Sequence, residues 1–191
     1  MTNNFEERLN QILPKITSDD FLSGRGLGNE IAFFIFDYPP EHELRVRKHV
    51  DFLLEHIPKH KPSLALAHVN LFDFLIKYLD DEGILEEAKE MDRKSGGPAL
   101  LEALKGILEE TAVAKRFADV VRPNEQDLIL ISGVGSVYPM IRSHTLLNNL
   151  HSVITKPPLV MFYPGKYDEK TLRLFGKIKS DNYYRAFRLI P

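Results

Sequence analysis

The fold class is decided by residues 128–139, which read Leu-Ile-Leu-Ile-Ser-Gly-Val-Gly-Ser-Val-Tyr-Pro. An unbroken apolar run ends in a turn rich in glycine and serine, and a helical pattern follows that turn. A run of this kind is typical of a strand covered on both faces, as in a parallel sheet. Residues 31–36 (Ile-Ala-Phe-Phe-Ile-Phe) form a similar run that ends at Asp37-Tyr-Pro-Pro40. We therefore expect a parallel sheet whose strands are buried on both sides.

Helical and strand patterns alternate outward from these two runs. The spacing of apolar residues predicts helices at 5–16, 41–57, 71–79 and 140–154, and a short one around 170–176. Further strands are predicted at 63–69, 159–163 and 184–190. Pro58 and Pro62 are expected to end the second helix.

This alternation predicts one α/β domain over residues 1–191, with three layers and a mostly parallel sheet of about five strands. Residues 1–28 would supply an N-terminal helix and loop. Residues 80–120 would form a helical insertion, broken at Ser95-Gly-Gly-Pro98. The fold would be Rossmann-like or P-loop-like, but the sequence lacks the phosphate-binding pattern G-x-x-x-x-G-K-[ST].

The composition excludes several kinds of protein. The 191 residues include 25 Lys and Arg against 27 Asp and Glu, so no overall charge attracts nucleic acid or acidic lipid. The absence of cysteine excludes disulfides, a thiolate nucleophile and Cys-ligated metals. No apolar run reaches the ~18 residues that cross a bilayer, and Glu6 and Glu7 stand where a signal peptide would be basic. We expect a cytoplasmic protein with no membrane partner.

Charge is distributed unevenly along the chain. Residues 80–110 carry ten acidic and four basic residues, which favours a solvated helical surface or a docking surface for a basic partner. Residues 156–191 carry eight basic and three acidic residues interleaved with Tyr and Phe. That pattern is typical of core aromatics with a basic rim, of a protein interface, or of a groove for single-stranded nucleic acid. The candidate contact residues there are Tyr183, Tyr184, Arg185 and Arg188.

Ligands of open parallel sheets bind beyond the carboxyl ends of the strands, so residues at those ends are candidates for a pocket. They are Asp37, Tyr38, Asn70, Gly133, Gly135, Ser136, Tyr138 and Tyr163. Gly133-x-Gly135 suits a tight structural turn or an anion contact. Ser132 and Ser136 are possible nucleophiles. Asp37 is a possible general base or metal ligand, or else a loop or capping residue. No complete catalytic motif accompanies them, and we predict neither a cofactor nor a metal.

The predicted helix at 140–154 carries a polar stripe. His144, Asn148 and His151 are spaced to lie on one face, with Arg142 preceding them. The two imidazoles would be ~10 Å apart along the helix, too far to share one metal. We expect either a polar face that contacts a partner or lines a cleft, or an ordinary solvated face.

Several sequence blocks, taken in their order, resemble one known family. They are Phe36-Asp-Tyr-Pro-Pro-Glu-His-Glu-Leu-Arg-Val-Arg47, His68-Val-Asn-Leu-Phe-Asp73, Gly133-Val-Gly-Ser-Val-Tyr-Pro139, Arg142-Ser-His-Thr-Leu-Leu-Asn-Asn-Leu-His151, Pro158-Leu-Val-Met-Phe-Tyr-Pro-Gly165 and Asn182-Tyr-Tyr-Arg-Ala-Phe-Arg-Leu-Ile-Pro191. The chain from about residue 30 to its end resembles the BrxB family of the BREX (bacteriophage exclusion) defence systems.

The resemblance implies a host-defence role beside a large ATPase, a DNA methyltransferase and an alkaline-phosphatase-like protein. It implies no chemistry, because the family has no established catalytic residues. We therefore expect a non-catalytic adaptor that binds other BREX proteins. The alternatives are a nucleic-acid-binding module that acts through the basic C-terminal segment, and a cryptic hydrolase or nuclease at the strand ends.

Overall fold

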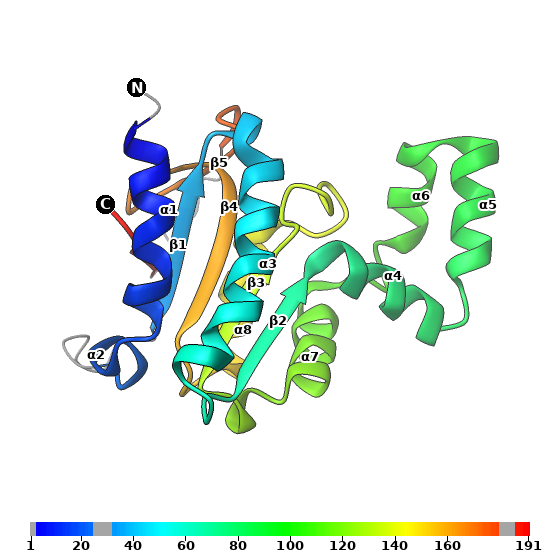
Figure 1. The fold of residues 1–191 in the computed structure, drawn as a ribbon. Helices are drawn as coiled ribbons and strands as arrows, with labels where there is room; N and C mark the ends of the chain where they lie inside the picture. The colour runs from blue at the N-terminus through cyan, green and yellow to red at the C-terminus, as the bar shows by residue number, and fades with distance from the viewer. Residues whose placement is uncertain (1–2, 25–31, 180–185) are drawn as a thin grey trace.

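The fold is taken from a computed structural model, which describes residues 3–24, 32–179 and 186–191 (Figure 1). Its α-helices are α1 (Asn3–Ile16), α2 (Asp19–Leu22), α3 (Glu43–His60), α4 (Leu71–Asp81), α5 (Leu85–Ser95), α6 (Gly97–Leu104), α7 (Glu110–Val121) and α8 (Ser143–Val153). Its strands are β1 (Phe33–Tyr38), β2 (Leu66–Asn70), β3 (Leu128–Ser132), β4 (Leu159–Tyr167), β5 (Leu172–Leu174), β6 (Ile178–Lys179) and β7 (Phe187–Arg188). Short 3-10 turns, η1 (Pro40–His42) and η2 (Pro123–Glu125), complete the set.

Five strands form a parallel sheet in the order β2-β3-β4-β1-β7. β4 lies at its centre, with Met161 paired to Ile35 of β1 on one side and to Ile131 of β3 on the other. β5 pairs antiparallel with the far end of β4, and β6 pairs antiparallel with β5. The predicted α/β class and the mostly parallel sheet are confirmed.

Side chains of the central strands alternate between two cores, which explains the unbroken apolar runs. On β4, Leu159 and Met161 join the core beneath α4, α7 and α8. Val160 and Phe162 join the core beneath α1 and α3. All four side chains are fully buried. The sheet thus lies between two helical layers, and Figure 1 shows α1 and α3 covering one of its faces.

Residues 80–120 are mostly helical, as predicted, and α7 at the end of this range packs on the sheet. α5 and α6 form a hairpin that stands away from the sheet in Figure 1, and Gly96 turns the chain between them with a φ of 78°. Leu100 and Leu104 of α6 are buried against the core shared with α4 and α7. The hairpin is therefore anchored on one side only.

Two predictions about local breaks are wrong. Pro58 does not end α3, which continues to His60. A proline so near the end of a helix removes one backbone hydrogen bond, and Ile57 beside it is fully buried and holds this turn against the sheet. His56 and His60 therefore share one continuous helix. Each ring bonds a backbone carbonyl of the preceding turn, at 2.9 and 3.0 Å.

The second wrong prediction is the short helix around residues 170–176. Residues 172–174 form β5, because Leu172 and Leu174 are buried while Arg173 between them is exposed, a period of two. β4 does not stop before Pro164-Gly165 but continues to Tyr167, so that β5 can pair with it. Gly165 permits this pairing, since a Cβ there would lie 2.1 Å from the carbonyl oxygen of Arg173.

The remaining differences concern the ends of elements. The predicted helix at 140–154 begins only at Ser143, and residues 133–142 form turns that include a cis peptide bond between Tyr138 and Pro139. The last strand covers Phe187–Arg188, and the earlier part of its predicted range lies outside the described residues. The end of the loop that is predicted up to residue 28 also lies outside the described residues. Within the described ranges, no helix is both long and apolar enough to cross a bilayer.

Candidate functional site

Asp37, at the carboxyl end of β1, holds three segments of the chain together. Arg8 of α1 donates to its carboxylate at 2.8 Å and to its carbonyl at 2.9 Å, and also to the carbonyl of Ile190 at 3.1 Å. The backbone N–H of Tyr167 donates to the other carboxylate oxygen at 3.1 Å. The guanidinium of Arg188 approaches the same carboxylate to 4.0 Å. With 13% of its side chain exposed, Asp37 is committed to contacts that close this edge of the sheet.

A second polar network connects β1, α3 and the turn after β3. The Tyr38 hydroxyl donates to Glu43 at 2.6 Å, and Arg47 donates to the other carboxylate oxygen of Glu43 at 2.9 Å. Arg47 also donates to the Ser136 hydroxyl at 3.2 Å. Burial and the hydrogen bond to Glu43 raise the pKa of Tyr38 well above its ordinary value, so the phenol stays protonated. Two of the predicted pocket residues, Tyr38 and Ser136, are thus joined through α3.

The glycines after β3 serve close packing. Gly133 has a φ of 72°, and a Cβ there would lie 2.3 Å from the side-chain oxygen of Asn70. That oxygen caps α4 by accepting the N–H of Phe72 at 3.0 Å. A Cβ on Gly135 would lie 2.9 Å from the Phe175 ring. These contacts favour the structural turn over an anion contact.

The predicted pocket residues therefore reach one edge of the sheet, as expected for parallel strands, but packed side chains occupy that edge. Tyr163 is buried in the core at 1% exposure. Tyr138 is partly buried and packs against the core under α7 and α8. Only Ser136 is well exposed among the eight.

The polar stripe on α8 divides between two environments. Arg142, just before the helix, and Asn148 are exposed. His151 instead stacks on Phe33 with ring centroids 4.2 Å apart. His144 lies in α8, but its side chain is not among those that the structure describes.

The C-terminal candidates divide in a similar way. Tyr183, Tyr184 and Arg185 lie outside the described residues. Arg188 turns inward, where it donates to the carbonyl of Tyr167.

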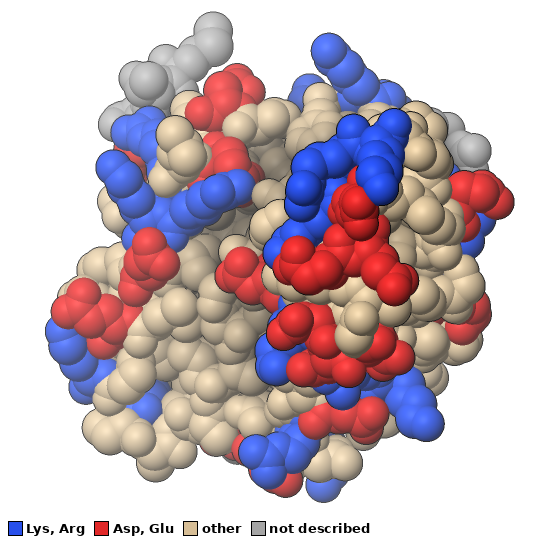
Figure 2. All heavy atoms as spheres, turned by 90° about the vertical axis from the view of Figure 1, so that its right-hand side faces the viewer, with Lys and Arg blue, Asp and Glu red and all other residues tan. Residues whose placement is uncertain are grey.

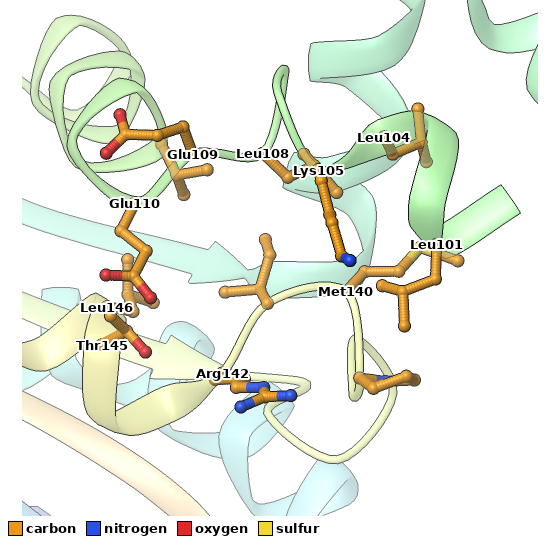
Figure 3. A pocket seen from close by; sticks show the side chains of 13 residues that line it. Leu101, Leu104, Lys105, Leu108, Glu109, Glu110, Met140, Arg142, Thr145 and Leu146 are labelled. Carbon is orange, nitrogen blue, oxygen red and sulfur yellow. The ribbon is translucent and has the colours of Figure 1, made fainter. Parts of the chain in front are cut away.

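Two cavities lie away from the centre of the strand-end edge. The first, of about 390 Å³, is bounded by α6, α7 and the segment that enters α8, and Figure 3 shows Lys105, Glu110 and Arg142 around its apolar floor. The second, of about 460 Å³, follows β2 between α3, α4 and α7. The sequence predicts neither cavity as such, because helices far apart in the chain form their walls. Among the predicted pocket residues, Asn70 lines the second cavity. A further local signal was His68, a polar residue in an otherwise apolar strand.

His68 lines the second cavity and bonds the Ser132 hydroxyl at 2.8 Å. Burial lowers the pKa of His68. The nearby carboxylates of Asp51 and Asp73 raise it again in part. A neutral histidine beside a serine is the beginning of a nucleophile–base pair. Ser132, however, is buried and lines neither cavity. Across the described ranges, no three His, Asp or Glu side chains are grouped to hold a metal.

We predict that Asp37→Ala lowers the free energy of unfolding by about 3 kcal/mol, because Arg8 then keeps a mostly buried charge without its partner. Urea denaturation followed by circular dichroism measures this loss. Glu55→Ala, which breaks an exposed ion pair with Lys59, is the control and should change stability little. An Asp37→Ala protein as stable as the control variant would contradict the structural role of Asp37.

The two partly buried histidines, His49 and His68, should make the stability of the folded chain depend on pH. Burial holds the pKa of His68 and of His49 below the ordinary 6.5, so the unfolded chain binds more protons than the folded one as the pH falls below that value. The thermal midpoint should therefore decrease between about pH 7.5 and 5.5. His68→Gln, which keeps a partner for Ser132, should reduce the decrease. Equal pH dependence in the variant and the natural protein would be inconsistent with a buried neutral His68.

Comparison with known proteins places the chain in a family. Residues 67–189 match the family described as BREX protein BrxB. A protein named BREX protein BrxB from Bacillus cereus (strain H3081.97) is 46% identical over 188 residues, which cover 96% of each chain. One of the same name from Escherichia coli O9:H4 (strain HS) is 41% identical over 187 residues, covering 97% of this chain and 92% of the relative. No solved structure matches. Similarity along nearly the whole length, to two proteins of one name, shows that the chain belongs to the BrxB family of BREX proteins.

Proposed function

We propose that this chain is a non-catalytic adaptor that binds other proteins of a BREX defence complex. The proposal rests mainly on the packing of side chains at the edge where the parallel strands end. An enzyme of this fold class would have its active site at that edge. Asp37 is bound by Arg8 and Tyr167 there, and Gly133 and Gly135 are packed against neighbouring side chains. Membership of a BREX family supplies the setting, and the ATPase, methyltransferase and phosphatase-like proteins of the system are the partners we expect.

The α5–α6 hairpin offers a surface for such a partner. Figure 2 looks onto the side of the molecule from which the hairpin projects and shows Asp and Glu gathered there. Glu86 and Glu90 pair with lysines of their own helix. Glu87 and Asp92 have no ion-pair partner among the described residues, and Met91 between them is 39% exposed. An acidic surface with an exposed apolar side chain suits a partner with a basic patch beside a hydrophobic one.

This proposal is tested by affinity capture. The immobilised chain should recover at least one other BREX protein of the same system at low salt, and the recovery should fall as salt rises. Glu87→Lys with Asp92→Lys should weaken capture about tenfold, because charge reversal repels a basic partner. Glu7→Lys with Glu41→Lys makes the same change in net charge elsewhere and serves as the matched control. Recovery of none of the BREX proteins would refute the adaptor role.

The nucleic-acid-binding module is retained as a second candidate because of one observation on β4 and β5. Lys166 and Arg173 are cross-strand neighbours with exposed side chains, and Phe175 at the following turn is 37% exposed. Cations beside an exposed ring are the components of a surface for single-stranded nucleic acid.

A labelled single-stranded oligonucleotide separates the two candidates by fluorescence anisotropy. The module predicts binding whose affinity falls steeply with salt, and Arg173→Glu should weaken it. Absence of any binding at about 50 mM salt would remove this candidate.

A further inference from the structure

β2 leaves one edge of the parallel sheet without a partner. Among the described residues it pairs only with β3. The N–H of Leu128 donates to the carbonyl of Ala65, so hydrogen bonds to β3 fall on alternate residues from Ala65 onward. The backbone groups of Leu66 and His68 therefore point to the free edge. Free edges of this kind are where extended segments of other proteins add as a further strand.

The free edge is also the floor of a groove. The cavity of about 460 Å³ follows β2, with Leu54 of α3 on one side and Val120 of α7 on the other. Val120 is 47% exposed, and four of the five residues of β2 are only partly buried. An added strand would thus find apolar side chains on both walls.

The charges of the groove identify the kind of segment that fits. Lys77 and Arg116 line it, but both are paired with Asp81. Asp51 of α3 and Asp73 of α4 also line it, both act electrostatically on His68, and neither has an ion-pair partner among the described residues. The groove therefore presents two uncompensated carboxylates, which favour a basic side chain.

We propose that the β2 edge binds an extended segment of a BREX partner, paired with the backbone of Leu66 and His68, with a Lys or Arg side chain between Asp51 and Asp73. This inference rests on the proposed adaptor function and names where and how one partner binds. A second copy of the chain is a poorer occupant, because pairing β2 with β2 would bring four uncompensated carboxylates together.

Hydrogen exchange and affinity capture together test the proposal on the full chain. The chain is incubated with the other BREX proteins of its system, and amide exchange is compared between the free and captured protein. The backbone amides of Leu66 and His68 should exchange more slowly in the complex. Asp51→Asn with Asp73→Asn should weaken capture about tenfold, whereas Glu55→Gln, on the outer face of α3, should not. Circular dichroism checks that each variant is folded.

The outcomes separate the two proposals. The β2 proposal is overturned if a BREX protein is captured while amide exchange at β2 is unchanged and the Asp51→Asn/Asp73→Asn variant captures as much as the natural chain. The adaptor role would then still stand. Failure to capture any BREX protein overturns the adaptor role and the β2 proposal with it. Size-exclusion chromatography with light scattering shows whether the chain alone forms a dimer. If it does, and the β2 amides exchange slowly in that dimer, the edge binds a second copy and the proposal of a heterologous partner is overturned.

Discussion

Burial of the central strands on both faces determines how the sheet, its helices and its polar edge are arranged. A strand covered on both sides must satisfy all its backbone hydrogen bonds within the sheet, because water cannot reach them. β4 does so between β1 and β3, with Met161 and Phe162 fully buried on opposite faces. Parallel pairing in turn brings the carboxyl ends of the strands to one edge, where polar residues gather.

That edge is stabilised by its own polar groups. The Arg8–Asp37 ion pair links α1 to β1, and the N–H of Tyr167 brings the extension of β4 to the same carboxylate. Tyr38, Glu43, Arg47 and Ser136 form a similar bridge between β1, α3 and the turn after β3. Groups committed in this way are poorly suited to change protonation or coordination during a reaction. The surfaces that we propose for binding lie at the periphery, on the α5–α6 hairpin and along the edge of β2.

Much of the fold could be predicted from the sequence, for a local reason. Apolar runs such as 128–131 and helical spacing are properties of neighbouring residues, so most of the strands and helices followed from them. The errors arose where distant contacts decide the structure. β5 pairs with an extended β4, and burial of Ile57 keeps Pro58 within a helix. The candidate edge residues were brought together, but their role in packing depends on Arg8 and Phe175, which lie far away in the chain. The groove at β2 could not be predicted, because its walls come from three separate helices.

We propose that this protein works by binding other proteins and not by chemistry at the sheet edge. The most direct test is a plaque assay in a host that carries the complete BREX system, with Ser132→Ala and Ser136→Ala introduced singly into this chain. Each substitution removes a hydroxyl that a hydrolase would need as its nucleophile. We expect phage restriction equal to that of the natural protein in both strains. Loss of restriction in either strain, with the altered protein folded and present at normal levels, would contradict it.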